Sequence, residues 1–588
     1  MCDSGGGNNG SGGRGRTRES RPPASVENTK ADGYHGIWYT LGSGPYGAKY
    51  SGGMGTYTSN HVPMAIYAPS VKKTFFVYGG QRDKGLMIMV SYYDHERGVV
   101  PRPTIVRDCG NFRDAHANPA LCIDGSGHIW VFSASRHSFE GRKYRSRKPY
   151  DIDAFDVVES RDGEDVRQEM AYPQPWWIEG KGFLFLFTQY TGGRELYWRT
   201  SENGTNWSAL KMMASGGHYQ TSGCKNGVVG SAFNYHPNGI NTRTDLYYVQ
   251  TRDFGQTWTT ADGKPLTTPL PMKAWKAPKN TALVHDYEVE KSLVYIHDLN
   301  FDADGRPVIL YLTAKDFNSG PSGDPRQWYT ARWTGESWDL RTITTSMHNY
   351  CVGCLHIEAD GAWRVIGPTE AGPQKWGTGG EMAMWLSADK GATWRKTAQL
   401  TADSAFNHSY ARRPLNAHPD FYAFWADGDP KHPSESRLYF ANRDGKVFQL
   451  PDAMKEDFAQ PALIKCKPMT AMVELKALII DRLYLYDGVT VDEDFVDDLT
   501  NKLEIKAGGT PPRDPINATI HACVKKGNDS TGMLDALISK AVEAMQKEPF
   551  VINEAKITVV AVTVEKRTTD EKLGLRIADL KMVMRVGD

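Results

Sequence analysis

The sequence predicts an all-β protein of the β-propeller class, followed by a smaller domain. Between about residues 31 and 449, short segments rich in Val, Ile, Tyr, Phe and Trp alternate with turn residues, as in "KTFFVYGG" and "GFLFLFTQY". One turn motif recurs at residues 201–208, 251–258 and 387–394. The gaps between its turn glycines are 51 and 136 residues, close to one and three units of about 45 residues, the blade length of several propeller families.

The recurring motif has the composition of a tight hairpin turn. Its copies read "SENGTNWS", "TRDFGQTW" and "SADKGATW". An Asp or Asn side chain accepts hydrogen bonds from nearby backbone amides, and Gly204, Gly255 and Gly391 supply the positive φ that the turn needs. The Trp that follows is expected to enter the next strand and pack inward. Dividing roughly 400 residues by about 50 to 57 per blade gives seven or eight blades.

Residues 1–30 are predicted to be a flexible linker, because they are rich in Gly and Ser and end in prolines. They contain no apolar segment of a signal peptide. Cys2 followed by a polar linker resembles a mature bacterial lipoprotein, which would allow a lipid anchor, and a disordered start is the alternative. No run of about 18 apolar residues occurs, so no membrane span is expected.

The composition changes after about Pro461, where the turn motifs and tryptophans end. Residues 530–548 place apolar side chains on one helical face, and residues 492–503 are a second helix candidate. Residues 555–567, "AKITVVAVTVEKR", are a strand candidate. We therefore expect a small α+β domain over residues 462–588. It contains no catalytic constellation, so docking, oligomerisation or glycan binding is its expected role.

The charge and cysteine counts exclude other classes of protein. Lys plus Arg and Asp plus Glu are equal at 69 each, which argues against binding to nucleic acid. The eight cysteines are too few and too scattered for a disulfide scaffold.

Several long motifs resemble a known family. They are "ADGYHGIWYTLG", "KYSGGMGTYTSNHVPMAIYAP", "YPQPWWIEGKG", "GRELYW", "NYHP", "GTGGEMAMWLSADKGATW" and "NAHPDFYAFWADGDP". Over about residues 31–451 the chain is similar to the sialidase-type (BNR) repeat propellers related to ulvan lyases. A sister group hydrolyses terminal rhamnose from glucuronic acid. The resemblance implies a seven-bladed β-propeller over residues 31–455 and an enzyme that acts on an acidic, sulfated polysaccharide.

The lyase reaction determines which residue types are needed. Ulvan lyases cleave a rhamnose–uronic acid linkage by β-elimination, which removes a weakly acidic proton at C5, next to a carboxylate. Arg neutralises the charge that builds up on that carboxylate, while Tyr or His moves the protons; Tyr does so when neighbouring cations lower its pKa. The reaction requires no metal or organic cofactor.

The resemblance implies a set of site residues, carried over motif by motif. The catalytic candidates are His116, Tyr172, Arg194, Tyr219 and His236, with Tyr190 and Tyr235 next. Arg194 would neutralise the carboxylate and Tyr172 would transfer a proton. Substrate binding is assigned to His218, Arg243 and Arg412. For any one of these histidines, a hydrogen-bonded turn or core residue is the alternative.

Two other functions remain open at this stage. The catalytic His of the sister hydrolases would correspond to His61 in "SNHVP", so a hydrolase that releases rhamnose is the first alternative. A propeller that binds glycans without turnover is the second. The substrate class implies a secreted, periplasmic or cell-surface protein.

A cluster of potential metal ligands lies near the end of the propeller region. "HNYCVGCLH" contains His348, Cys351, Cys354 and His356, in which two Cys three apart, flanked by His, have the spacing of zinc ligands. His408 and His418 could complete a structural zinc site between the last blades, and two buried thiols are the alternative.

Overall fold

The computed structural model describes two parts of the chain. The first is residues 26–464, apart from gaps at 55–60, 83–84, 111–113, 135–139, 160–169, 192, 218 and 271–278. The second comprises residues 516–525, 550–552, 555–570 and 575–587. Cys2, most of the expected linker and both helix candidates lie outside the described residues.

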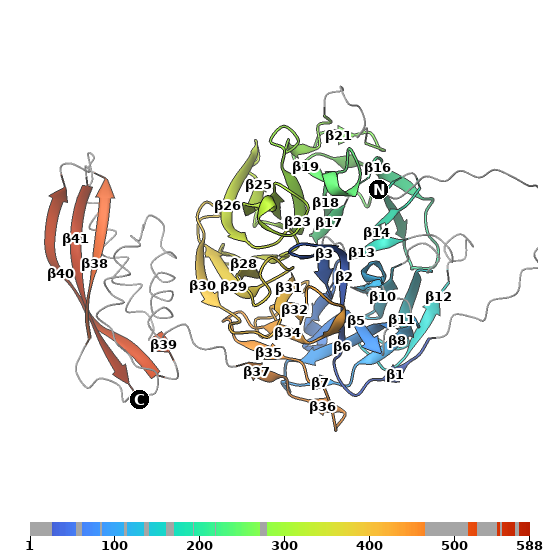
Figure 1. Ribbon diagram of the computed structural model, residues 1–588, viewed down its shortest axis with the longest axis horizontal. Coiled ribbons are helices and arrows are strands. Elements are labelled where there is room, and N and C mark those ends of the chain that lie inside the picture. The colour runs from blue at the N-terminus through green and yellow to red at the C-terminus, as the bar shows by residue number, and fades with distance from the viewer. Residues whose placement is uncertain are drawn as a thin grey trace, which may run out of the picture.

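Six antiparallel sheets of residues 119–464 follow the chain in order around a ring (Figure 1). One sheet contains β9 (Pro119–Ile123), β10 (Ile129–Ser133), β11 (Arg142–Ser146) and β12 (Phe155–Val158). The next contains β13 (Ala171–Ile178), β14 (Gly182–Gln189), β15 (Glu195–Ser201) and β16 (Lys211–Ala214). The third contains β17 (Gln220–Lys225), β18 (Val228–Tyr235), β19 (Thr244–Thr251), β20 (Trp258–Thr259), β21 (Pro265–Leu266) and β22 (Leu283–His285). The fourth contains β23 (Leu293–Phe301), β24 (Pro307–Ala314), β25 (Arg326–Trp333) and β26 (Trp338–Ser346). The fifth contains β27 (Cys354–Ile357), β28 (Trp363–Glu370), β29 (Glu381–Ser387) and β30 (Arg395–Gln399). The sixth contains β31 (Asn407–Arg412), β32 (Ala423–Gly428), β34 (Leu438–Ala441), β35 (Val447–Gln449) and β37 (Ala462–Ile464).

The first sheet is composite. Its order is β1-β8-β6-β5-β2-β3, with β4 on β5 and β33 on β2. Its strands are β1 (Thr29–Lys30), β2 (Gly36–Gly44), β3 (Gly47–Gly52), β4 (Ala65–Ala68), β5 (Lys73–Arg82), β6 (Gly85–Asp94), β8 (Thr104–Asp108) and β33 (Ser434–Ser436). A separate pair joins β7 (Val100–Pro101) to β36 (Phe458–Ala459), and short 3-10 turns lie at η1 (Pro69–Val71), η2 (Ala115–Ala117), η3 (Ile240–Thr242) and η4 (Pro321–Gly323).

The expectation of seven equivalent blades is therefore corrected to six regular blades and a composite first sheet. Counting by repeat length assumes that every unit takes its strands from one stretch of sequence. The first sheet instead recruits β2 from the start of the chain and β33 from near the end of the propeller region, because β2 pairs with both β5 and β33. This pairing joins the first and last parts of the ring.

The recurring turn has the predicted geometry in all three copies, which lie between β15 and β16, between β19 and β20, and between β29 and β30. In the last copy, Asp389 Oδ1 accepts hydrogen bonds from Ser387 Oγ at 2.8 Å and from the Thr393 amide at 2.9 Å. Gly391 has a φ of +87°. The expectation that the Trp packs inward is confirmed for Trp207 and Trp258, which are buried.

Stacking of the sheets buries both faces of the middle strands. Every residue of β14 and of β24 is buried, because each strand lies between two neighbours in its own sheet and beneath the adjacent sheets. The first strands of successive sheets contact one another, so they form the inner wall of the ring. Side chains at the start of these inner strands therefore point toward a shared region.

The described C-terminal residues form one antiparallel sheet with the order β38-β41-β40-β39. Its strands are β38 (Ile516–Lys525), β39 (Phe550–Ile552), β40 (Ala555–Asp570) and β41 (Leu575–Gly587). The strand predicted over residues 555–567 is confirmed within β40. The expected α+β domain is not supported, because the described residues of this part are all in strands.

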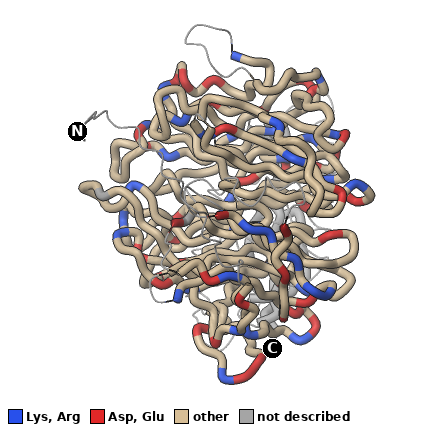
Figure 2. Tube along the Cα trace, turned by 90° about the vertical axis from the view of Figure 1, so that its right-hand side faces the viewer, with Lys and Arg blue, Asp and Glu red and all other residues tan. Residues whose placement is uncertain are grey.

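Basic and acidic residues are interspersed along the chain in Figure 2, which agrees with the equal charge counts. Within the described part of the chain, no helix is long and apolar enough to cross a membrane.

Candidate active site

Each sheet of the ring places one aromatic or imidazole side chain at or just before its inner strand. In chain order these are His61, His116, Tyr172, Tyr219, Tyr295, Tyr350 and Tyr410. Neighbouring rings lie close together: the centroids are 5.2 Å apart for His116 and Tyr172, 5.6 Å for Tyr172 and Tyr219, and 5.2 Å for Tyr295 and Tyr350. The last three tyrosines were missed by the sequence analysis, although their equivalent place in each repeat was a usable signal.

Tyr172 is held in an unusual backbone conformation. Its φ is +56°, and the pairing of β13 with β14 shifts register between Ala171 and Gln174. Such a bulge redirects a side chain, and strain of this kind concentrates at functional sites. Burial raises the pKa of the Tyr172 phenol well above its usual range, and Arg194 only partly opposes this. The pKa-lowering effect of cations expected from the sequence therefore does not dominate, and Tyr172 is a proton donor at neutral pH.

His116 is oriented by a carboxylate that sequence reasoning missed. Its Nδ1 contacts Asp114 Oδ1, and its backbone amide donates to the same oxygen at 2.9 Å. An Nδ1–H bond to a carboxylate leaves the lone pair of a neutral imidazole on Nε2, which suits a general base. The signal was an Asp two positions before the His in "RDAHANP".

Two guanidinium groups flank Tyr219. The Cζ of Arg194 lies 5.3 Å from the ring centroid of Tyr190 and 5.5 Å from that of Tyr219. The Cζ of Arg243 lies 4.9 Å from Tyr219 and 4.6 Å from Tyr295. Burial opposes both charges, but the surrounding phenols outweigh it and raise the pKa of both arginines. Both are therefore permanent cations in a ring of aromatic faces.

Lys49 is a third cation of this region, and the sequence analysis did not find it. It lies on β3, in the hairpin that Figure 1 shows near the middle of the ring, and its Nζ donates to Asn241 Oδ1. Burial, together with the charges of Arg243 and Arg194, lowers the pKa of Lys49 to about 8. Among the described residues, no Asp or Glu forms an ion pair with Lys49, Arg194 or Arg243. Among the residues that the structure describes, these three cations therefore have no acidic partner in an ion pair.

The remaining catalytic candidates lie around this cluster. The ring of His236 is 4.9 Å from that of Tyr219, and its amide donates to Gly217 O at 3.0 Å. Tyr190 Oη is 3.5 Å from Tyr172 Oη. Tyr235 instead packs against the hydrophobic cluster that contains Trp258, so the structure does not join it to the set. His218 lies outside the described residues.

His61 and Arg412 line a small cavity of about 30 Å³ together with His297, and the ring of His61 also lies 5.7 Å from that of Tyr172. Burial lowers the pKa of His61 to about 3, and its Nε2 is 3.1 Å from His116 O, so its imidazole is neutral. Burial also lowers the pKa of Arg412 to about 10, and its Nε donates to Met54 O at 2.9 Å.

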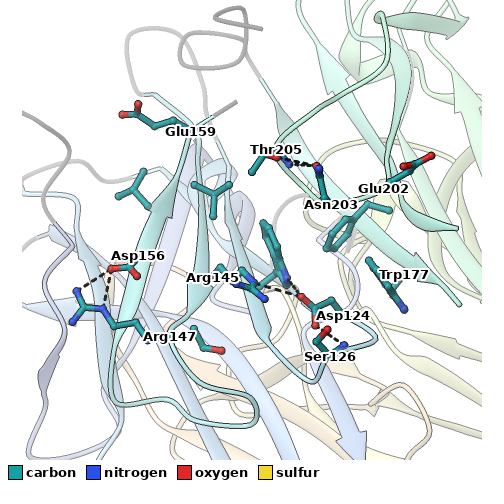
Figure 3. A pocket seen from close by; sticks show the side chains of 15 residues that line it. Asp124, Ser126, Arg145, Arg147, Asp156, Glu159, Trp177, Glu202, Asn203 and Thr205 are labelled. Carbon is teal, nitrogen blue, oxygen red and sulfur yellow. Dashed lines mark hydrogen bonds and ion pairs between the residues drawn. The ribbon is translucent and has the colours of Figure 1, made fainter. Parts of the chain in front are cut away.

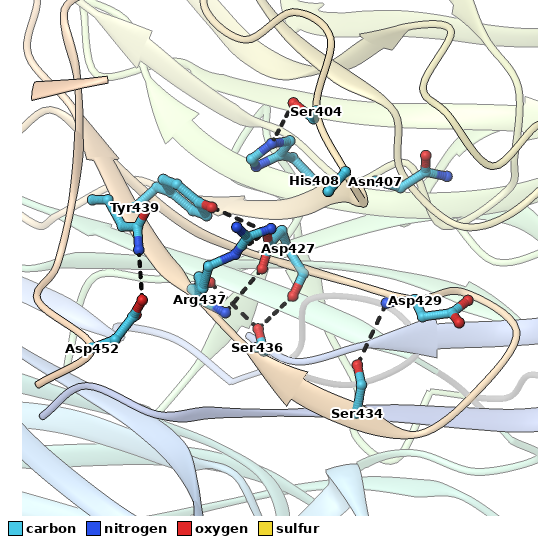
Figure 4. Close-up of polar contacts among 12 residues, drawn as sticks. Ser404, Asn407, His408, Asp427, Asp429, Ser434, Ser436, Arg437, Tyr439 and Asp452 are labelled. Atoms are coloured by element: carbon cyan, nitrogen blue, oxygen red, sulfur yellow. Dashed lines mark hydrogen bonds and ion pairs between the residues drawn. The ribbon is translucent and has the colours of Figure 1, made fainter. Parts of the chain in front are cut away.

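The residues of the expected zinc site are not brought together. His408 Nε2 lies 2.9 Å from Ser404 Oγ, as Figure 4 shows, and Trp425 Nε1 donates to His408 Nδ1 at 3.1 Å. His348 Nδ1 accepts from the Tyr350 amide, Cys351 Sγ contacts Gly379 O, and Cys354 Sγ is 3.9 Å from His356 Nε2. His418 lies beside His95 instead. The expected set is thus dispersed among separate polar contacts. Residues that are close in sequence here point their side chains to different partners.

Two larger pockets are lined by other residues. One, of about 680 Å³, opens between the sheets of β9–β12 and β13–β16 (Figure 3). Its polar groups largely pair with one another: Arg145 lies 3.5 Å from Asp124, and Arg147 lies 2.9 Å from Asp156. A second pocket, of about 520 Å³, lies at the β2–β3 hairpin and is lined by Tyr46, Lys375, Trp376 and Lys431.

Comparison with known proteins agrees with this fold. Residues 83–346 match the profile of a family described as "BNR repeat-containing family member". Two structures of a polysaccharide lyase of family PL25, an ulvan lyase, align with a TM-score of 0.54 and 15% identity over 71% of this chain and 96% of theirs. One of them is bound to -[GlcA(1-4)Rha3S]-. Polysaccharide lyase Uly1 aligns with a TM-score of 0.49 and 12% identity, over 69% of this chain and 97% of its own.

At this identity the ulvan lyase structures show a shared fold. No curated protein matches the chain in sequence. The expected kinship with rhamnosyl-glucuronate hydrolases finds no support in these comparisons. The hydrolase alternative through His61 stays a prediction that these comparisons do not test.

Proposed function

We propose that this protein is a polysaccharide lyase that cleaves a rhamnose–uronic acid linkage of an acidic, ulvan-like polysaccharide by β-elimination. The observation that carries the proposal is the contiguous cluster of Arg194, Tyr219, Tyr172 and His116, in which a permanent cation, phenols and an oriented imidazole meet. The fold shared with the ulvan lyase structures adds support.

Each group of the cluster has a role in this chemistry. Arg194 neutralises the uronate carboxylate, which carries additional charge once the C5 proton is removed. His116, oriented by Asp114, accepts that proton on Nε2. Tyr172 remains protonated because it is buried, and it donates its proton to the leaving oxygen at C4. These steps use only side chains of the chain itself.

The surroundings of the cluster suit a charged polymer. Lys49 and Arg243 add positive charge that no described Asp or Glu pairs with, and an anionic sugar would supply the acidic partner. The pocket at the β2–β3 hairpin contributes Lys375, Lys431 and the aromatic face of Trp376, which extends a binding surface beyond one linkage.

Digestion of ulvan by the full chain tests this function. A lyase yields an unsaturated uronate whose conjugated double bond absorbs ultraviolet light, and its products together weigh one water less than those of hydrolysis. Rhamnose release without an absorbing product would overturn the lyase assignment. Binding without turnover would leave a glycan-binding propeller.

Substitution of Arg194 tests the mechanism. We expect Arg194→Ala to lower kcat/KM by about 100- to 1000-fold, because the enediolate loses its cation, and Arg194→Lys to retain part of the activity. Arg341→Ala is the matched control, since Arg341 is an exposed arginine paired with Asp339 on β26. Equal activity of Arg194→Ala and Arg341→Ala would contradict the assigned role.

A further inference from the structure

A cluster of metal-ligand side chains lies at the seam between the first sheet and the last blade. It consists of His95, which follows β6, and of His418 and Asp420, in the segment between β31 and β32. One ligand atom from each residue lies within 4.8 Å of the other two. Among the described residues, this is the group of three or more His, Cys, Asp or Glu side chains whose geometry could hold a metal ion.

The separation of His95 and Asp420 is close to that of two ligands of one ion. His95 Nδ1 is 3.8 Å from Asp420 Oδ2, which is too long for a hydrogen bond. His418 Nδ1 accepts a hydrogen bond from the Asp420 amide at 3.2 Å, so Nε2 is the nitrogen of His418 that offers a lone pair to an ion. Zinc bonds to nitrogen and oxygen are about 2.0–2.2 Å, so two tetrahedral ligands of one zinc ion lie roughly 3.3–3.6 Å apart.

The orientation of His95 supplies an independent reason. Its Nε2 is 2.8 Å from Thr74 Oγ1, while its Nδ1 is buried and has no hydrogen-bond partner. The side chain of His95 is 4% exposed. A second ring nitrogen held by a hydrogen bond is typical of a metal-ligating histidine, because it fixes the tautomer and aims the other nitrogen at the ion. A cation beside Nδ1 would also remove the cost of burying an unpartnered polar atom next to a carboxylate.

The surrounding residues hold the three ligands in place. The ring of Tyr67 lies 5.1 Å from that of His95 and 4.9 Å from that of His418, and the two imidazoles are 4.0 Å apart. The Tyr67 amide also donates to Leu415 O at 2.9 Å, which fixes β4 against the segment that carries His418. Asp420 is 56% exposed, so an ion could enter from solvent and keep a water ligand.

We propose that His95, His418 and Asp420 bind one zinc ion, which ties the composite first sheet to the last blade and stabilises the closed ring. Two imidazoles and one carboxylate favour zinc over Mg²⁺ and Ca²⁺, which prefer oxygen ligands. Such a staple does not take part in the proposed elimination, so the site stands independently of the catalytic function.

Zinc binding by the metal-stripped full chain tests the proposal. We expect one zinc ion per chain that depends on this site, measured by calorimetry and elemental analysis, and a rise in Tm when zinc is added. His418→Ala and Asp420→Asn should each weaken zinc binding by about 10-fold or more and remove most of the rise in Tm. His432→Ala is the matched control, because His432 is exposed and pairs with Asp429 in its own turn.

Two further measurements keep the test decisive. Co²⁺ in place of zinc should give visible absorption typical of nitrogen and oxygen ligands, and His418→Ala should lose it. The proposal is overturned if His418→Ala and Asp420→Asn bind zinc as tightly as the unaltered chain, or if Ca²⁺ raises the Tm as much as zinc does. Circular dichroism of each variant separates loss of the ion from loss of the fold.

Discussion

At the scale of single residues, Lys49 has the most testable chemistry. Its lowered pKa of about 8 results first from burial and then from Arg243 and Arg194. The ammonium group is charged below that pH and neutral above it. The folded state therefore disfavours the charged lysine relative to the unfolded chain, and this destabilisation is fully present below about pH 8 and is relieved as the pH rises toward the usual lysine pKa.

We expect kcat/KM for an anionic polysaccharide to fall above about pH 8, as Lys49 loses the charge that attracts the substrate. In Lys49→Arg this decline should shift to higher pH, because a guanidinium stays charged. In Lys49→Met the activity should be low and should lack the decline. Lys446→Met, at an exposed turn, is the control. An unchanged alkaline limb in Lys49→Met would assign the titration to another group.

Sequence reasoning found the site residues that the family resemblance carried over. It missed those that reach the site only through the three-dimensional fold. Tyr172 and Arg194 fall in quoted motifs, and His116 and Tyr219 were carried over by the same resemblance; the structure places the four in contact. Lys49 reaches the same region only because a hairpin from the first sheet extends to the middle of the ring, which no local pattern encodes. His418 was expected to be a metal ligand in a set with His408, whereas its actual neighbours, His95 and Asp420, depend on how the ring closes.

At the scale of elements, the turn at residues 387–394 shows why one motif recurs. Gly391 has a φ of +87°, and a Cβ at this position would lie 2.7 Å from Cζ3 of Trp363. Glycine is therefore required at this position for two reasons: the backbone conformation of the turn and the close packing of a neighbouring indole. The same two constraints act at Gly204, where an added Cβ would lie 2.3 Å from Trp130.

We expect Gly391→Ala to lower the free energy of unfolding by about 2–4 kcal/mol, the sum of backbone strain and a clash with Trp363. Gly361→Ala isolates the strain, because Gly361 has a φ of +89° and open space around the added Cβ. Its cost should be about 1–2 kcal/mol. Denaturant unfolding of both variants measures the difference. Equal costs would show that the indole moves aside freely.

These constraints explain what could be predicted at this scale. The turn motif fixes its own geometry through contacts between residues that are at most four apart, so three turns were predicted correctly. The number of regular blades was not predicted correctly. β2 and β33 are far apart in the sequence, and no local pattern in either strand indicates that they pair. The role of residues 462–588 lacks even a motif to start from.

At the scale of the whole molecule, the pairing of β2 with β33 joins the first and last parts of the ring, and we call this contact the β2–β33 seam. Trp38 on β2 pairs with Ser434 on β33 and is fully buried. Gly428, at the end of β32, packs against its indole so tightly that an added Cβ would lie 2.1 Å from Cδ2 of Trp38. Gly428 has no unusual φ that would favour glycine, so its small size is explained by the indole alone.

This contact predicts a specific coupling. Trp38→Ala should lower the free energy of unfolding by about 3–5 kcal/mol, because it leaves a cavity at the seam. Gly428→Ala should cost about 1–3 kcal/mol in the unaltered chain through overpacking, but little or nothing when Trp38 is already Ala, since the cavity accepts the new methyl group. Chemical denaturation of the two single variants and the double variant gives the coupling energy, and Trp376→Ala, a half-buried Trp outside the seam, controls for loss of an indole. Additive costs would mean that the two residues act independently and that the ring is closed by other contacts, such as the Tyr67–Leu415 hydrogen bond.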